Sequence, residues 1–97
     1  MNAVNLVQEC NALHDYWKSA EIGRLNDSHV YVCKMKGEWN WHHHEEADEM
    51  FLVVKGRLLI RLRDREIRLS EGECCVIPKG IEHQTIAEEE AHVMLLE

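Results

Sequence analysis

Several features common in other classes of protein are missing from this sequence. No run of apolar residues reaches the length of a membrane span. Residues 1–10 have neither the basic start nor the apolar stretch of a signal peptide. Internal repeats and low-complexity segments are also absent. We therefore expect residues 1–97 to form one small domain that has no membrane partner.

Basic charge is scarce as well. The chain has 11 lysines and arginines against 18 acidic residues, which gives a formal net charge of −7. Arginines do gather over residues 57–68, but Asp64 and Glu66 interrupt them. An acidic chain gains nothing from the release of counterions by a phosphate backbone, so we exclude nucleic acid as a partner. A domain this small buries limited apolar area, and a homodimer would add to it.

The four cysteines form no recognisable motif. The sequence has neither a C-x-x-C pair nor the spacing of a disulfide framework. Cys74 and Cys75 are adjacent, so on a strand they would point to opposite faces. We interpret all four as small buried apolar residues in a reducing compartment, which predicts a cytoplasmic protein.

The first twenty residues have the spacing of an amphipathic helix. Leu6, Cys10, Leu13 and Trp17 recur at intervals of four, three and four residues, which places them on one helix face. Gly23 follows and fits a helix stop. The pattern predicts one N-terminal amphipathic helix over about residues 3–20.

From about residue 29 to residue 97 the apolar spacing changes to every second residue, as in β-strands. Strands are expected at about residues 30–36, 38–44, 50–55, 58–63, 67–69, 74–77, 83–86 and 92–96. Short strands with turn signals about every eight to twelve residues predict an all-β sandwich or barrel. The helix would cap or cover one face of it.

Three consecutive histidines, His42, His43 and His44, are the sharpest chemical feature. If they lie on a strand, His42 and His44 point to one face and His43 to the other. Two imidazoles on one face can share a metal ion with a carboxylate from beyond a bend, and Glu49 is placed to supply it. The alternative for the histidines taken alone is a solvated patch.

The intervening acidic residues favour a different role. Glu45, Glu46 and Asp48 are more typical of a solvated loop than of metal ligands, although Asp48 could orient a ligand imidazole. Further along, Pro78 and Gly80 predict a tight turn directly before His83.

Two spaced patterns carry a family resemblance. The first reads H-x-H-x4-E-x6-G and consists of His42, His44, Glu49 and Gly56. The second reads G-x5-P-x-G-x2-H and consists of Gly72, Pro78, Gly80 and His83. Together they resemble the two motifs of the cupin family, and their short separation resembles small single-domain cupins. Two departures concern turns rather than ligands, since Gly37 lies one residue closer to His42 than the family pattern asks and Ala87 replaces its final asparagine.

The resemblance implies a fold and a metal site. It implies a jelly-roll barrel, also called a double-stranded β-helix, in which His42, His44, Glu49 and His83 bind one divalent metal ion. Zinc held by four protein ligands would be coordinatively closed and structural. Six-coordinate iron, manganese, nickel or cobalt would keep two positions open for dioxygen or for two substrate oxygens.

The expected cavity is mostly apolar. Its lining is predicted to include Asn40, Phe51 and Val53, and further Tyr31, Met35, Ile77 and Thr85. It suits a small, partly apolar organic ligand. Tyr31 could donate a proton, although a packed aromatic ring is the favoured interpretation. Trp39 and Trp41 would lie on the opposite face, covered by the helix or by the second subunit of a homodimer.

Three functions compete at this level. The ligand set favours a metalloenzyme that acts on a small organic substrate as an oxygenase, isomerase or lyase. The lack of a convincing acid–base pair favours a binding module that holds a small ligand or metal without catalysis. A purely structural metal that stabilises a marginal barrel is the third.

Overall fold

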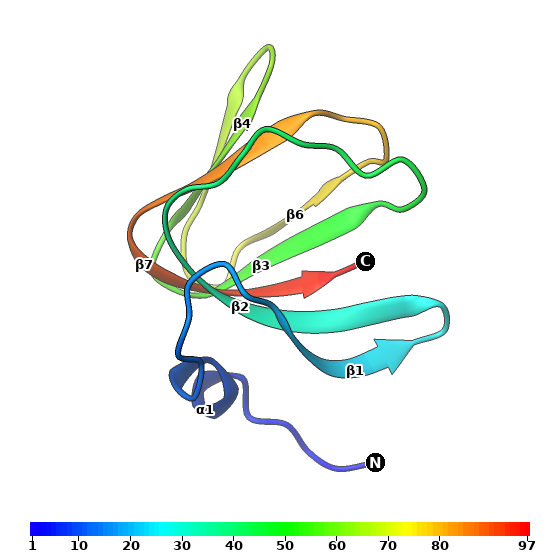
Figure 1. Ribbon diagram of the computed structural model, residues 1–97, viewed down its shortest axis with the longest axis vertical. Helices are drawn as coiled ribbons and strands as arrows, with labels where there is room; N and C mark the ends of the chain where they lie inside the picture. The colour runs from blue at the N-terminus through cyan, green and yellow to red at the C-terminus, as the bar shows by residue number, and fades with distance from the viewer.

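The structure is a computed structural model that describes residues 1–97. It contains one short helix and seven β-strands, all paired antiparallel (Figure 1). The elements are α1 (Leu6–Asn11), β1 (Ala20–Leu25), β2 (Ser28–Glu38), β3 (Glu49–Lys55), β4 (Leu58–Leu62), β5 (Glu66–Leu69), β6 (Cys74–Ile77) and β7 (His83–Leu96). This is the predicted all-β jelly roll with one N-terminal helix. No helix has the length and apolarity needed to cross a bilayer.

Strand β7 organises the whole sheet. It pairs with β2 along one edge, and along its other edge with β4 first and then with β3. β1 extends the sheet beyond β2, β6 extends it beyond β3, and β5 pairs with β4. In Figure 1, β7 (orange to red) curves from the β4 end of the molecule to the β1–β2 end. The two halves of the jelly roll are therefore built on one bent strand.

The crossing from β3 to β4 beside β7 depends on a glycine. Gly56 has a φ of 89°, a conformation that L side chains rarely adopt. A Cβ at this position would lie 2.9 Å from the backbone oxygen of Glu90 in β7. Only a residue without a side chain allows the chain to turn this close to β7.

The core lies between the inner faces of these strands. Its residues alternate along each strand, and those in β3 and β4 are Phe51, Val53, Leu58 and Ile60. Arg61 on β4 is exposed, on the face of the strand opposite to Leu58 and Ile60. The same inward parity that fills the core also brings the first residues of β3 and β7 to the site described below.

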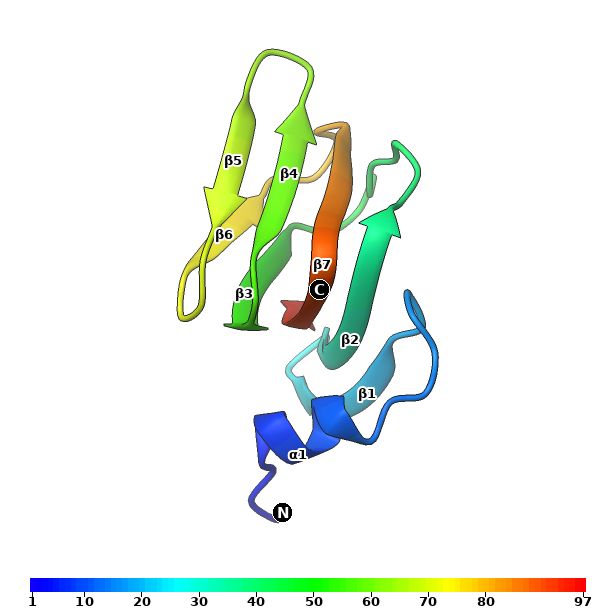
Figure 2. The ribbon, with the colours of Figure 1, turned by 90° about the vertical axis from the view of Figure 1, so that its left-hand side faces the viewer.

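The helix is much shorter than predicted. It begins at Leu6, where the side chain of Asn5 caps it by accepting a hydrogen bond from the backbone N–H of Gln8, and it ends at Asn11. The predicted helix range of about 3–20 is therefore wrong. Residues 20–25 form β1, and their backbone groups hydrogen-bond to β2 instead of to a longer helix. Figure 2 shows α1 at the same end of the molecule as β1, and the helix contacts β2 and β7. The sheet consequently starts at residue 20, not at about residue 29.

Two of the buried-cysteine predictions are confirmed and one is wrong. Cys10 and Cys33 are buried, and burial raises the pKa of both thiols. Cys75 is half-buried, whereas Cys74 is exposed. The two neighbours lie on opposite faces of β6, as adjacent residues of a strand must.

Candidate metal centre

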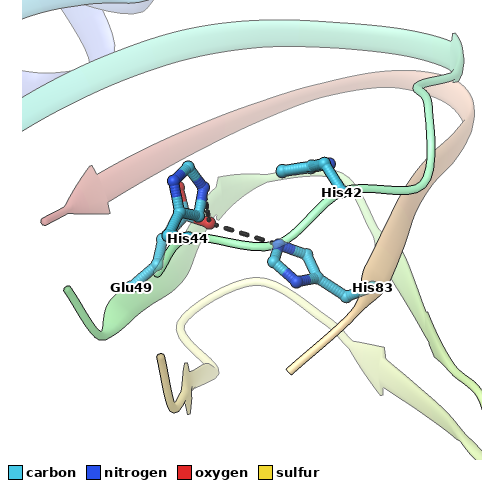
Figure 3. A group of neighbouring side chains, drawn as sticks. All are labelled: His42, His44, Glu49 and His83. Atoms are coloured by element: carbon cyan, nitrogen blue, oxygen red, sulfur yellow. Dashed lines mark ion pairs between the residues drawn. The ribbon is translucent and has the colours of Figure 1, made fainter. Parts of the chain in front are cut away.

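Four side chains from three separate segments converge at one end of the jelly roll (Figure 3). His42 and His44 come from the loop 39–48, Glu49 opens β3 and His83 opens β7. One possible ligand atom from each lies within 4.8 Å of those from the others. The structure therefore brings together all four residues that the sequence singled out.

The loop that carries two of the histidines is not the strand predicted over residues 38–44. β2 ends at Glu38, and only His42 pairs like a strand residue, in an isolated bridge with His83. In this bridge the backbone N–H of His42 donates to the His83 oxygen at 3.0 Å, and the His83 N–H donates back at 2.9 Å. The N–H of Gly80 also donates to the His44 oxygen at 2.7 Å. The second motif thus fixes the backbone of the first.

Asp48 belongs to the same connection. Its carboxylate accepts a hydrogen bond from the backbone N–H of Lys79 at 2.9 Å. The suggestion that Asp48 orients a ligand imidazole is wrong, because its side chain holds the turn at Pro78–Gly80 instead. It acts on the backbone that leads into His83.

Two imidazoles have their outer nitrogens fixed by backbone carbonyls. Nδ1 of His42 lies 2.9 Å from the oxygen of Asn40, and Nδ1 of His83 lies 2.9 Å from the oxygen of Ile81. A carbonyl only accepts hydrogen bonds, so each Nδ1 must carry the proton. In the neutral imidazole Nε2 then has no proton and is free to bind a metal ion.

Buried polar atoms without partners mark the centre of the cluster. Nε2 of His44, Nε2 of His83 and Oε1 of Glu49 are buried and accept or donate no hydrogen bond. The Glu49 oxygen lies 3.3 Å from the His44 nitrogen and 3.4 Å from the His83 nitrogen, but neither contact has hydrogen-bond geometry. Such groups are costly to bury unpaired. Atoms bound to one ion at about 2.1 Å lie up to about 4.2 Å apart, so these separations suit a shared metal.

Electrostatics at His83 favour a positive charge. Burial lowers the pKa of this imidazole, but the Glu49 carboxylate and the Ile81 carbonyl raise it by more, so the pKa lies above its ordinary value. The carboxylate therefore stabilises a cation at this point. A metal ion would supply that charge in place of a proton.

The sequence interpretation missed one acidic residue at this site. Oε2 of Glu97 lies 3.5 Å from Nδ1 of His44, and burial together with the charge of Glu49 raises the pKa of the Glu97 carboxyl. Its backbone is fixed by paired hydrogen bonds with His29. Parity could have found it, because Glu97 follows the buried residues Val93 and Leu95 at the same spacing.

Comparison with known proteins decides the family. The model of the Cupin domain family matches residues 30–97, about two thirds of the chain. This protein is a cupin. The crystal structure of a cupin-2 domain protein from Shewanella frigidimarina is similar to it, with 38% identity, a TM-score of 0.93, and coverage of 97% of this chain and 92% of that one.

Other relatives of this cupin support the same assignment. Protein NMB1881 from Neisseria meningitidis has 28% identity and a TM-score of 0.90, with 99% of this chain and 98% of that one covered. The uncharacterized protein YdbB of Bacillus subtilis is 37% identical over 82 residues, which span 84% of this chain and 73% of YdbB. The family rests on the match of the Cupin domain model to residues 30–97, and the names of these two proteins indicate no reaction.

The two departures from the family motifs face each other in this cupin. Gly37 of β2 pairs with Ala87 of β7, directly after a bulge in the β2–β7 register. Gly37 has a φ of 86°, and Ala87 is fully buried. The shifted glycine and the missing asparagine thus belong to one local adjustment of the sheet, which leaves the four converging residues in place.

A cavity of about 230 Å³ opens beside the cluster. Met35, Phe51 and Thr85 line it as predicted. The other predicted lining residues do not: Asn40, Tyr31, Val53 and Ile77. Tyr31 instead stacks with His29, with ring centroids 6.0 Å apart, so its possible role as a proton donor finds no support. A larger groove of about 520 Å³, between β4–β5 and Glu88–Glu90, contains none of the four site residues.

The two tryptophans beside the histidines lie in different places. Trp39 lines the cavity and stacks on Trp17. The prediction that Trp39 lies on the face opposite to the metal ligands is therefore wrong. The reason is the loop, which has no strand parity at Trp39. Trp41 lies under the guanidinium of Arg63, 3.8 Å from the ring centroid. Both indoles contact groups of their own chain, and the homodimer stays a prediction.

The remaining histidines lie outside the cluster. His43 is exposed and lies 3.4 Å from the carboxylate of Glu45, as expected of a residue that does not share the face of its neighbours. His29 pairs with Glu21. His92 is buried, and its Nε2 lies 2.8 Å from the Glu90 carboxylate, to which it hydrogen-bonds.

Proposed function

We propose that this cupin binds one divalent metal ion through His42, His44, Glu49 and His83, and that the bound ion is the centre of an enzyme acting on a small organic molecule. The observation that carries the proposal is the meeting of three buried, unpartnered atoms on His44, Glu49 and His83. Buried polar atoms in proteins nearly always have a hydrogen-bond partner or bind an ion. A mixed set of imidazole and carboxylate ligands suits first-row metals such as iron, manganese, nickel, cobalt or zinc.

The arrangement supports catalysis more than a closed structural site. The cluster borders a cavity of about 230 Å³, so a ligand has space next to the ion. When bound, such an ion supplies Lewis-acid or redox chemistry. The chain itself contributes an apolar wall, formed by Met35, Phe51 and Leu95, that excludes water from one side of the site. We therefore propose an oxygenase, isomerase or lyase.

One observation favours the alternative of a non-catalytic binding module. Apart from the proposed ligands, Cys33 and Glu97 are the only titratable side chains that line the cavity. Neither Lys, Arg nor Tyr reaches it. General acid–base work would depend on Glu97 alone, which limits the reactions that this site could run.

Metal analysis tests the proposal directly. Protein purified without added metal should contain close to one first-row metal ion per chain, as measured by inductively coupled plasma mass spectrometry. His83→Ala should lose it, because His83 is buried at the centre of the cluster. His43→Ala is the matched control, since His43 points away to Glu45. Equal metal content in the two variants would contradict the proposed site.

The same preparations separate the two functions. Metal identity comes first, because iron, manganese, nickel or cobalt keeps positions open for a substrate, whereas zinc with four protein ligands is closed. Turnover of any compound in a broad panel, lost in His42→Ala and kept in His43→Ala, would support the enzyme. Closed zinc with no turnover would support the binding module.

A further inference from the structure

Two tryptophans line the cavity side by side. Trp17 and Trp39 come from distant parts of the chain, yet their rings stack with centroids 5.4 Å apart and planes 23° from parallel. Both line the cavity together with His42 and His44. Trp39 remains 42% exposed. An indole left this open beside a cavity offers a flat apolar surface to whatever enters.

The chain holds this pair in a fixed position. Trp17 has a φ of 65°, which is unusual for a bulky residue. Its backbone N–H donates to the Lys34 oxygen at 2.8 Å, and its indole N–H donates to the Lys36 oxygen at 2.9 Å. The backbone N–H of Trp39 donates to the Thr85 oxygen at 2.9 Å. Strained backbone that is fixed by several contacts is typical of functional sites.

The charge of the cavity limits what it can accept. The two carboxylates that line it belong to Glu49 and Glu97, and no Lys or Arg side chain joins them. Arg63 is occupied on the outside by Trp41 and by the carboxylate of Glu82 at 3.1 Å. A phosphate group would find no cation from the chain. An uncharged ligand meets no such penalty.

The size of the cavity indicates a single ring. A dry cavity of about 150 Å³ is enough to hold benzene. The volume here, about 230 Å³, leaves space for one ring and a small substituent that reaches His42, His44 and Glu49. A much larger ligand would have to extend past Trp39 into solvent.

We propose that Trp17 and Trp39 form a stacking platform, and that the site takes an uncharged compound with one flat aromatic ring and two adjacent oxygen atoms, rather than a phosphorylated substrate. The inference rests on the proposed function, because the oxygen pair is the part that faces the metal ion. The ring would lie against the exposed part of Trp39 and the oxygen pair would reach inward.

Two hydroxamates test the platform. Benzohydroxamic acid and acetohydroxamic acid, called hydroxamates below, carry the same oxygen pair and are uncharged at neutral pH before they bind, but only the first has a ring. Their affinities for the Ni²⁺-loaded protein, residues 1–97, are measured by titration calorimetry. Benzohydroxamate should bind more tightly to the wild type. In Trp39→Ala its affinity should fall about three- to tenfold, as expected for one lost aromatic stack, while that of acetohydroxamate stays unchanged.

Trp41→Ala is the matched control. Trp41 is also a tryptophan of the 39–48 loop, but it packs against Arg63 outside the cavity. It should leave both affinities unchanged. An equal loss in Trp39→Ala and Trp41→Ala, or an equal loss for the two hydroxamates, would overturn the inference and leave the proposed metal site intact. Failure of Ni²⁺ to bind the wild type would overturn both.

A third ligand tests charge without any variant. 4-Carboxybenzohydroxamate adds one negative charge to the same ring. It should bind the wild type at least about threefold more weakly than benzohydroxamate, because no basic side chain lines the cavity. Equal or tighter binding would show that the site accepts anionic substrates and would overturn the proposed substrate class.

Discussion

The carboxylate of Glu97 lies 3.5 Å from Nδ1 of His44. His42 and His83 have backbone carbonyls in the corresponding place. His44 is therefore the one imidazole of the three that has a charged partner behind it. Such a partner fixes the tautomer of a ligand histidine and makes it a stronger donor to a metal ion.

Removal of Glu97 should weaken metal binding. We expect Glu97→Ala to lower the affinity for Ni²⁺ or Zn²⁺ about tenfold, the lower end of the range for outer carboxylate partners of ligand histidines, and Glu97→Gln to lower it less. Competition with a chromogenic chelator measures the affinity. Glu88→Ala is the control, because Glu88 is an exposed glutamate of β7, the strand that Glu97 follows. Unchanged affinity in Glu97→Ala would remove Glu97 from the site.

A bound metal ion should raise the thermal stability of the protein. At a free metal concentration of 100 times the dissociation constant, mass action predicts about 2.7 kcal/mol of stabilisation. The rise in Tm on adding metal should disappear in His42→Ala and persist in His43→Ala, and EDTA should reverse it. A rise of the same size in both variants would mean that the metal binds elsewhere.

The turn at Gly56 should not tolerate a side chain. We expect Gly56→Ala to lower the free energy of unfolding by about 2 kcal/mol, because the φ is positive and the new Cβ would contact the backbone of Glu90. Gly23→Ala is the matched control, since a Cβ at position 23 would meet no surrounding atom within 4 Å and the φ there is not positive. Urea unfolding compares the two. Equal free energies of unfolding for Gly56→Ala and Gly23→Ala would contradict this prediction, because they would show that the backbone between β3 and β4 adjusts to a side chain.

Glu90 should make the fold sensitive to acid. Hydrogen bonds from His92 and Tyr16 hold the pKa of this carboxyl below its usual value. A lowered pKa in the folded state gives stability that is present above the ordinary pKa of about 4.5 and is lost as the pH falls through the folded value. The Tm advantage of the wild type over Glu90→Gln should therefore shrink as the pH falls below the ordinary pKa of about 4.5.

The control for that experiment is its sequence neighbour. Glu89 is exposed and makes no ion pair, so Glu89→Gln should follow the wild type across the same pH range. Because Glu90 itself is partly exposed, we expect shifts of only a few degrees. A constant difference between the wild type and Glu90→Gln at all pH values would contradict the assignment.

The sequence was a good guide wherever the spacing of residues has one physical meaning. Alternation identified the inward residues of β3 and β4, because a side chain of a strand can point only to one face or the other. It was a poor guide between residues 12 and 25. The spacing of Leu13 and Trp17 fits a helix, but Trp17 packs on Trp39 and residues 20–25 gain more by pairing with β2.

The four residues of the site and their family follow from the sequence alone, since His42, His44, Glu49 and His83 stand at fixed distances from the glycines and the proline of the turns. Their convergence, the place of Glu97 behind His44 and the stacking of Trp17 on Trp39 were decided only by the tertiary structure. The physical reason is that spacing along a chain fixes local backbone geometry, whereas contacts between distant segments depend on how the whole sheet bends around β7.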